Sequence, residues 1–399
     1  MRGCAAALAL SAAVSTFAAI PEYHNPTGDE FPILAWFSIL PDSAQTPERY
    51  RELREAGFNI SFPHLKTDEQ VERALSAMDG TGVKLMVTSH GLVDNTAATV
   101  NRFKDNPNVA GWFLRDEPTA DGFKELAEFR DRVYGADTTH VVYLNLFPSM
   151  VDPAALKVKD YDEYVDRFID EVRLPMVSYD FYPIVDEGGS VHVRAQFYDN
   201  LERVSRICRE RDMPFWGFCL STAHTPYPVP NNVHMRFEAF SALAYGAQCI
   251  QYFTYWQPEG TQWNFHNSPI DETGRRTNVY YLIKDLNREI HALTPVFLGA
   301  KVKSIGHTGA EIPMTTQRFT AFPDEFRAVD ADGQGVLVSH LVNGDRNYMM
   351  IVNRDIDHSQ TVTVDKDACV QRVESDGRTV ADHDTVAVVG PGDYLLYTW

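Results

Sequence analysis

Short apolar segments alternate with longer amphipathic segments from residue 33 to about residue 293. Eight short segments have the length and composition of buried strands, and they lie at 33–38, 58–62, 83–87, 109–114, 141–146, 176–179, 215–220 and 249–255. The longer segments place apolar residues at helical spacing, which predicts helices over 47–56, 69–78, 122–134, 161–172, 193–211, 233–245 and 278–293. Repeated strand and helix alternation of this length predicts an α/β fold, a (β/α)8 TIM barrel.

The pattern changes near Pro295 to short runs in which apolar and polar residues alternate. These runs lie at 335–341, 348–352, 361–364, 369–373 and 394–398, with Asn-Gly, Asp-Gly and Gly-Pro-Gly turns between them. We therefore predict that a barrel over 19–299 is followed by a small C-terminal antiparallel β-sandwich domain over 300–399.

The first residues have the pattern of a secretory signal peptide. Arg2 precedes an apolar run over 4–14, and small residues suit cleavage after Ala18. We expect residues 1–18 to be removed and the mature protein to be secreted or periplasmic. Cys4 leaves a lipoprotein anchor as an alternative, but no apolar run precedes it. No later segment has the length of a membrane span.

Charge and cysteine spacing narrow the choice of partners. The 399 residues include 36 Lys and Arg against 55 Asp and Glu, a net charge of -19, which disfavours nucleic acid and anionic membranes as partners. The cysteines form no C-x-x-C pair, and no Gly-rich phosphate-binding motif is present. We predict no metal site and no cofactor.

Barrel enzymes place their active sites at the carboxyl ends of the strands. The fourth strand ends in Asp116 and Glu117, and the sixth ends in Asp180, with Tyr179 and Tyr182 beside it. Other strand ends are followed by Trp36, His90, Asn145, His224 and Trp256. Paired carboxylates can cleave a glycosidic bond, and aromatic faces can stack on sugar rings. This combination predicts a carbohydrate substrate.

Several of these segments resemble a known group of enzymes. The Gly-Trp-Phe-Leu-Arg-Asp-Glu-Pro sequence at 111–118 is similar to the Asn-Glu-Pro strand end of clan A glycoside hydrolases, and Trp256 matches their eighth-strand tryptophan. Residues 270–277 and 391–397 resemble the end of the barrel and the β-sandwich of family 42-like β-galactosidases. The resemblance implies a glycoside hydrolase that cleaves a β-linked, galactoside-like substrate, with Glu117 as the acid/base.

The sequence departs from the clan at two positions. Asp116 replaces the usual Asn, and the seventh strand, at 215–224, contains no Glu where the clan places its nucleophile. One hypothesis makes Asp180 the second carboxylate, because residues 177–180 look like the sixth-strand element of family 18 chitinases. A second follows the likeness of the Asp-Glu pair to family 20 hexosaminidases, in which a substrate acetamide is the nucleophile. A third makes Cys219 the nucleophile.

We take the first hypothesis as the leading one. It assigns Glu117 as acid/base, Asp116 as its orienting partner, Asp180 as second carboxylate, and Trp256 with Tyr182 as the sugar platform. The remaining predicted substrate contacts are Trp36, His90, Asn145, Tyr179 and His224. A barrel that binds carbohydrate without cleaving it stays open as an alternative, because the seventh strand lacks a carboxylate.

Overall fold

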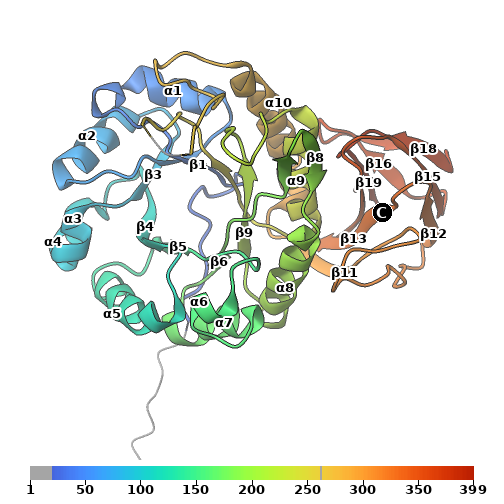
Figure 1. Ribbon diagram of the computed structural model, residues 1–399, viewed down its shortest axis with the longest axis horizontal. Helices are drawn as coiled ribbons and strands as arrows, with labels where there is room; N and C mark the ends of the chain where they lie inside the picture. The colour runs from blue at the N-terminus through green and yellow to red at the C-terminus, as the bar shows by residue number, and fades with distance from the viewer. Residues whose placement is uncertain (1–19, 261–262) are drawn as a thin grey trace, which may run out of the picture.

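The computed structural model describes residues 20–260 and 263–399, which form a barrel and a smaller β domain at its side (Figure 1). The predicted signal peptide at 1–18 lies outside the described residues. No helix in the described part of the chain is long and apolar enough to cross a membrane.

Eight parallel strands form the barrel in the order β5-β4-β3-β2-β1-β10-β9-β6, and a bridge between Leu146 and Tyr179 joins the first and last of them. They are β1 (Ile33–Trp36), β2 (Ile60–Phe62), β3 (Lys84–Val87), β4 (Val109–Asp116), β5 (Val141–Asn145), β6 (Val177–Ser178), β9 (Phe215–Leu220) and β10 (Ile250–Phe253). Each lies within or overlaps a predicted strand, so the predicted TIM barrel is confirmed.

Helices surround the strands (Figure 1). They include α1 (Pro47–Glu55), α2 (Asp68–Met78), α5 (Phe123–Tyr134), α7 (Tyr161–Arg167), α8 (Gln196–Glu210), α9 (Asn232–Ala244) and α10 (Asn278–Ala292). Thr46 and Thr67 cap the first two with their hydroxyls. The pattern at 161–172 changes from α7 to a π-helical turn over Phe168–Val172.

Several short elements were not predicted because they are too brief to give a periodic pattern. Three are the helices α3 (His90–Asp94), α4 (Thr96–Phe103) and α6 (Pro153–Leu156). Two are the strands of a hairpin, β7 (Ile184–Glu187) and β8 (Ser190–Val193), which follows β6 at the catalytic face. The backbone N–H of Asp186 donates to the carbonyl of Pro226 at 2.8 Å, so this hairpin packs on the loop after β9.

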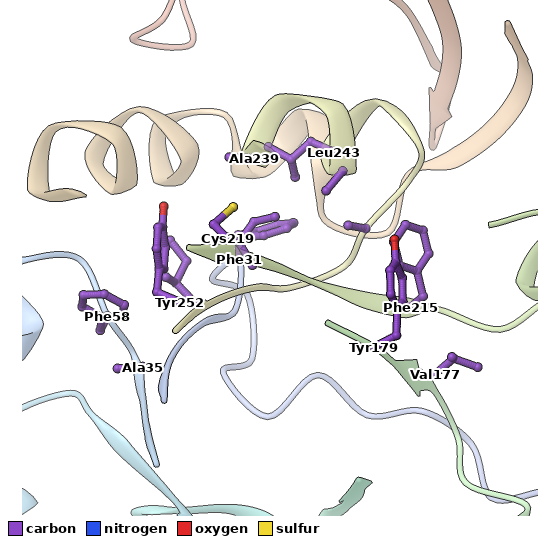
Figure 2. Packing of buried hydrophobic residues seen from close by; sticks show 14 of the residues in the cluster. Phe31, Ala35, Phe58, Val177, Tyr179, Phe215, Cys219, Ala239, Leu243 and Tyr252 are labelled. Atoms are coloured by element: carbon purple, nitrogen blue, oxygen red, sulfur yellow. The ribbon is translucent and has the colours of Figure 1, made fainter. Parts of the chain in front are cut away.

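Strand alternation divides the barrel core into two layers. Trp36, Tyr143 and Trp216 point into the barrel. Tyr179, Phe215, Cys219 and Tyr252 point outward toward the helices, where Cys219 faces Ala239 and Leu243 of α9 (Figure 2). At the base of the barrel, the indole N–H of Trp216 donates to the Tyr23 hydroxyl at 3.2 Å. The segment before β1 therefore closes the end of the barrel opposite the catalytic face.

The C-terminal part is a β-sandwich, as predicted. Its six-stranded sheet has the order β11-β13-β14-β19-β16-β17, and its three-stranded sheet has the order β12-β15-β18. The strands are β11 (Lys301–His307), β12 (Phe326–Ala331), β13 (Val336–Asn343), β14 (Arg346–Asn353), β15 (Gln360–Lys366), β16 (Gln371–Val373), β17 (Thr379–Ala381), β18 (Val386–Val389) and β19 (Tyr394–Thr398). A short helix, α11 (Thr294–Phe297), precedes them.

The sandwich is joined to the barrel by a half-buried ion-pair network. Arg236 of α9 pairs with Glu289 of α10 and with Asp393 of the sandwich, each at 2.6 Å. The Tyr394 hydroxyl also donates to Glu289 at 2.8 Å. These bonds fix the sandwich against the two helices.

Candidate active site

A pocket of about 380 Å³ lies at the carboxyl ends of the barrel strands. Its polar floor is formed by Asp116, Glu117, Asp180 and Asn145, and its walls are largely aromatic. The other lining residues are Trp36, Pro148, Met150, Phe181, Tyr182, Phe218, His224, Thr225, Pro226, Tyr227, Phe253, Trp263 and Phe265. The predicted cluster of carboxylates and aromatic rings is therefore assembled at one mouth.

Both acids of the fourth strand face this pocket, although simple alternation along a strand would point them in opposite directions. The backbone explains the difference, because Glu117 has φ 44°, in the left-handed region. Its N–H donates to the carbonyl of Asn145 at 2.8 Å, which ties this turn to β5. Such a conformation costs a non-glycine residue roughly 1–3 kcal/mol and is concentrated at functional sites. Arg115 points away and pairs with Glu125 at 3.3 Å.

Asn145 bridges the carboxylates of its two neighbouring strands. Its side-chain N–H groups donate to Asp116 at 3.3 Å and to Asp180 at 3.0 Å. The side-chain carbonyl of Asn145 accepts from Ser178 at 2.9 Å. Asp180 and Glu117 are in turn hydrogen-bonded to one another through their carboxyl groups. One carboxyl must hold a proton for this bond to form.

Burial in the pocket raises the pKa of all three carboxyl groups. For Glu117, desolvation is the largest cause, and the nearby charges of Asp180 and Asp116 raise its pKa further. Burial also raises the pKa of Asp180, but less, since hydrogen bonds from Asn145, its own backbone and Glu117 favour its charged form. Desolvation and the charge of Asp180 raise the pKa of Asp116 to about 7. The shared proton therefore resides mainly on Glu117, and Asp180 is the anion.

Aromatic rings surround these acids. Tyr182 lies against Phe253 and Tyr227, with ring centroids 5.7 Å apart in both pairs. His224 lies 4.7 Å from both Tyr227 and Phe265. Burial lowers the pKa of His224 to about 4, so this imidazole is neutral near pH 7. The walls thus present apolar ring faces with few charges, which suits the C–H faces of a sugar.

The structure places three predicted site residues outside the pocket. His90 is exposed at the start of α3. Tyr179 faces outward, 6.3 Å from Phe215, because it alternates with Ser178 and Asp180 along the chain (Figure 2). Trp256 is buried beneath the guanidinium of Arg49, which lies 5.2 Å from its ring. Trp36, Asn145, Tyr182 and His224 do line the pocket, together with the three acids.

Phe253 occupies the rim position that we assigned to Trp256. It ends β10 beside Trp36 in the parallel register, whereas Trp256 follows after the chain has turned to pair with Ile270. Phe218 was not predicted from the sequence either. It faces inward beside Gln251 in the register of β9 and β10. Alternate residues of a strand point to the same face. Counting in steps of two from a position paired with an inward residue of the neighbouring strand would therefore have identified both Phe253 and Phe218.

The seventh strand supplies no carboxylate to the pocket. Every residue of β9 is apolar or glycine. Glu238 approaches this strand from behind, on α9, and accepts the N–H of Leu220 at 2.7 Å. Cys219 lies on the outer face of the strand, and burial raises its thiol pKa well above the ordinary value. The structure therefore gives no support to Cys219 as the nucleophile.

The closed parallel barrel with carboxylates at its strand ends, followed by a β-sandwich, has the architecture that the sequence predicts. Comparison with known proteins relates part of the chain to glycoside hydrolases. Residues 156–293 match the family model Glyco_hydro_42, described as beta-galactosidase. Over 134 residues the chain is 28% identical to beta-galactosidase LacA of Lactobacillus acidophilus. That match covers 32% of this chain and 19% of the relative, so the chain spans about a fifth of the relative's length.

Solved structures show the same fold over almost the whole chain. The beta-galactosidase from Bacillus circulans sp. alkalophilus has a TM-score of 0.61 at 10% identity, covering 93% of this chain and 99% of that one. A catalytic mutant of Gan42B, a GH42 beta-galactosidase from G. stearothermophilus, has a TM-score of 0.60 at 9% identity, covering 94% and 99%. A family 5 glycoside hydrolase from Bacteroides vulgatus has a TM-score of 0.57 at 10% identity, covering 92% and 89%. At these identities the likeness is one of fold.

Proposed function

We propose that the protein is a glycoside hydrolase that cleaves a β-linked, galactoside-like sugar, with Glu117 as acid/base and Asp180 as second carboxylate. The hydrogen-bonded Glu117–Asp180 pair at the floor of an aromatic pocket carries this proposal. The family 42 match supports the sugar class, because the matched relatives are named as beta-galactosidases. It also favours hydrolysis of a plain galactoside over the acetamide-assisted and non-catalytic alternatives.

Glu117 has the properties of a general acid. Its raised pKa keeps it protonated near pH 7, so it can donate to the glycosidic oxygen as the bond breaks. In the free protein that proton is directed at Asp180. The glycosidic oxygen of a substrate must therefore replace the Asp180 carboxylate as the acceptor.

Asp180 then becomes free to act on the sugar. Asn145 holds it in its charged form, and an anion beside C1 stabilises the positive charge that develops there. Asp116 accepts a hydrogen bond from the same Asn145 amide. It serves as the orienting partner of Glu117.

The separation of the pair bears on the course of the reaction. Retaining enzymes hold their two carboxyl groups about 5–5.5 Å apart and inverting enzymes about 6.5–9.5 Å apart. The close interaction of Glu117 with Asp180 favours the shorter spacing. We therefore propose that the reaction retains the configuration of the sugar. The configuration of the first-formed sugar, followed by ¹H NMR, tests this proposal, and formation of the inverted sugar would contradict it.

A screen with aryl β-glycosides tests the function itself. Purified protein is incubated with galactoside, glucoside, mannoside, N-acetylglucosaminide and N-acetylgalactosaminide, beside an Asp180→Asn variant. We expect release from the galactoside, with a loss of about 10²–10⁴-fold in the variant. Release from the acetamido sugars alone would favour substrate assistance, and binding without release from any sugar would favour the non-catalytic barrel.

Two further proposals concern the N-terminal segment and the domain boundary. Residues 1–18 act as a secretory signal, supported by their sequence, and N-terminal sequencing of the exported protein would show whether it begins at residue 19. The domain boundary lies at 299/300, supported by the position of this point between α11 and β11. Limited proteolysis that releases a fragment starting near residue 300 would agree with it.

A further inference from the structure

A chain of hydrogen bonds runs through the interior of the barrel and ends at Asn145. The indole N–H of Trp36 donates to the Tyr143 hydroxyl at 3.2 Å and to the side-chain carbonyl of Gln251 at 3.4 Å. The Tyr143 hydroxyl donates to that same carbonyl at 2.6 Å. The side-chain N–H of Gln251 donates to the Ser178 hydroxyl at 2.9 Å. All four side chains are buried, and they come from four different strands.

The directions of these bonds follow from their donors and acceptors. The Gln251 carbonyl accepts from the indole N–H of Trp36 and from the Tyr143 hydroxyl, which leaves its amide N–H group to donate to Ser178. Ser178 accepts from Gln251, and its single proton has two acceptors within reach, the Tyr143 hydroxyl at 3.5 Å and the nearer side-chain carbonyl of Asn145 at 2.9 Å. The shorter bonds thus lead from Gln251 through Ser178 to Asn145.

The orientation of Asn145 is the result. With its carbonyl held by Ser178, its N–H groups face the carboxylates of Asp116 and Asp180. A flipped amide would instead turn its oxygen toward two carboxylates, where like partial charges repel. Water does not compete for this choice, because Asn145 is 2% exposed and Ser178 is 0% exposed.

We infer that Gln251 is a positioning residue, which fixes the Asn145 amide through Ser178 and so keeps Asp180 in its charged form. Gln251 does not line the pocket, so it acts without touching substrate. The inference rests on the proposed function for its meaning in catalysis, since it explains how Asp180 stays the anion of the pair. Its structural content, the control of the Asp180 proton, can be measured without substrate.

The surroundings of Asp180 contain other groups that titrate. Those facing it are Asp116 and Glu117 at the end of β4, Tyr161 and Tyr164 on α7, and Tyr182 and Tyr227 in the pocket wall. Gln251 is not hydrogen-bonded to any of these groups. The titratable group that it does contact is Tyr143, whose hydroxyl donates to the Gln251 carbonyl at 2.6 Å. A change in the titration of Asp180 then reports on the hydrogen-bond chain.

Carboxyl ¹³C NMR titration of Gln251→Met tests the inference. Methionine has a similar shape but neither donates nor accepts strongly, so Ser178 loses the donor that directs its proton toward Asn145. We expect the midpoint of Asp180 to rise by about one pH unit, the size of one hydrogen bond to a charged group. Asp180→Asn assigns the signal. An unchanged midpoint in folded Gln251→Met would overturn the inference.

Matched variants distinguish loss of the hydrogen-bond chain from general damage to the barrel core. Ser178→Ala removes the link and should reproduce the shift, whereas Ser178→Thr keeps the hydroxyl and should not. Gln248→Met removes another buried glutamine, one that bonds to Phe297 and Gly299 at the base of the barrel, and should leave the midpoint unchanged. If Gln251→Met does not fold, the comparison of Ser178→Ala with Ser178→Thr tests the inference. Equal Asp180 midpoints in these two variants would overturn it.

Activity adds a separate reading. If the wild-type protein cleaves the galactoside, the acidic limb of its kcat/KM profile should move upward in Gln251→Met with KM little changed. If the wild-type protein cleaves no glycoside, the proposed function fails, while the NMR titration still supports or overturns the role of Gln251.

Discussion

Glu117 and Asp180 share a hydrogen bond although they come from β4 and β6, which are not neighbours in the barrel. The strand between them, β5, contributes Asn145, whose amide contacts the acids of both sides. Three consecutive strands thus supply the Glu117–Asp180 pair, which shares a proton, and the Asn145 amide, which donates to the Asp180 anion. Because the ends of parallel strands meet at one rim, residues more than 60 positions apart form a single site.

The pH dependence of hydrolysis should reflect this pair. Burial raises the pKa of both members, and activity requires Asp180 ionised and Glu117 protonated. kcat/KM should therefore decline through an acidic midpoint that lies above the ordinary Asp pKa of about 4. It should decline again through an alkaline midpoint that lies well above the ordinary Glu pKa. A pH series with an aryl galactoside measures both limbs. An acidic limb near pH 4 would show that Asp180 is not perturbed.

Asp116 should cost stability at neutral and alkaline pH. Its folded pKa is about 7, above the unfolded value of about 4, so the folded state holds a proton that the unfolded state has released. Its contribution to stability therefore declines as pH rises from about 4 to about 7. Asp116→Asn removes that loss. The Tm of the variant minus that of wild type should be larger at pH 8 than at pH 4, and an equal difference at both would contradict the assignment.

Phe253, and not Trp256, should support the sugar ring. Phe253→Ala removes a pocket wall and should raise KM about tenfold, the loss of one to two kcal/mol of ring contact, with a smaller change in kcat. Trp256→Phe is the matched variant, since this ring packs under Arg49 outside the pocket. It should lower Tm while leaving KM near the wild-type value. The reverse pattern would restore Trp256 as the platform.

The sandwich should depend on Arg236 for its attachment. Arg236→Met leaves Glu289 half-buried without its partner and should lower the free energy of unfolding by roughly 3 kcal/mol. Arg236→Met combined with Glu289→Met removes both charges and should recover part of that loss. Denaturant unfolding of the two variants gives the comparison, and a double variant less stable than the single one would show that the pair is not coupled in this way.

The fold was predictable because its signals are local. Each barrel strand is a short apolar run, and each long helix has its own apolar face and often its own cap, as at Thr46 and Thr67. The short helices at 90–103 and the hairpin at 184–193 were missed, since they lie in loops and depend on tertiary contacts such as that between Asp186 and Pro226.

The candidate site was predictable only in part. Strand ends identified the acids, but the inward or outward direction of a side chain depends on strand parity and on the exact point where a strand stops. Tyr179 faces the helices for the first reason, and Trp256 lies beyond the rim for the second. The left-handed turn at Glu117, which brings both adjacent acids into the pocket, leaves no mark in the sequence.

The role of Glu117 as acid is tested most directly by the leaving-group dependence of Glu117→Gln. A dinitrophenyl β-galactoside needs little protonation of its leaving oxygen, whereas a methyl or phenyl β-galactoside needs a full proton. We predict that the variant loses about 10²–10⁴-fold in kcat/KM on the poor leaving groups and far less on dinitrophenolate. Equal losses on all three substrates, or no loss on any, would contradict the assignment of Glu117 as the acid.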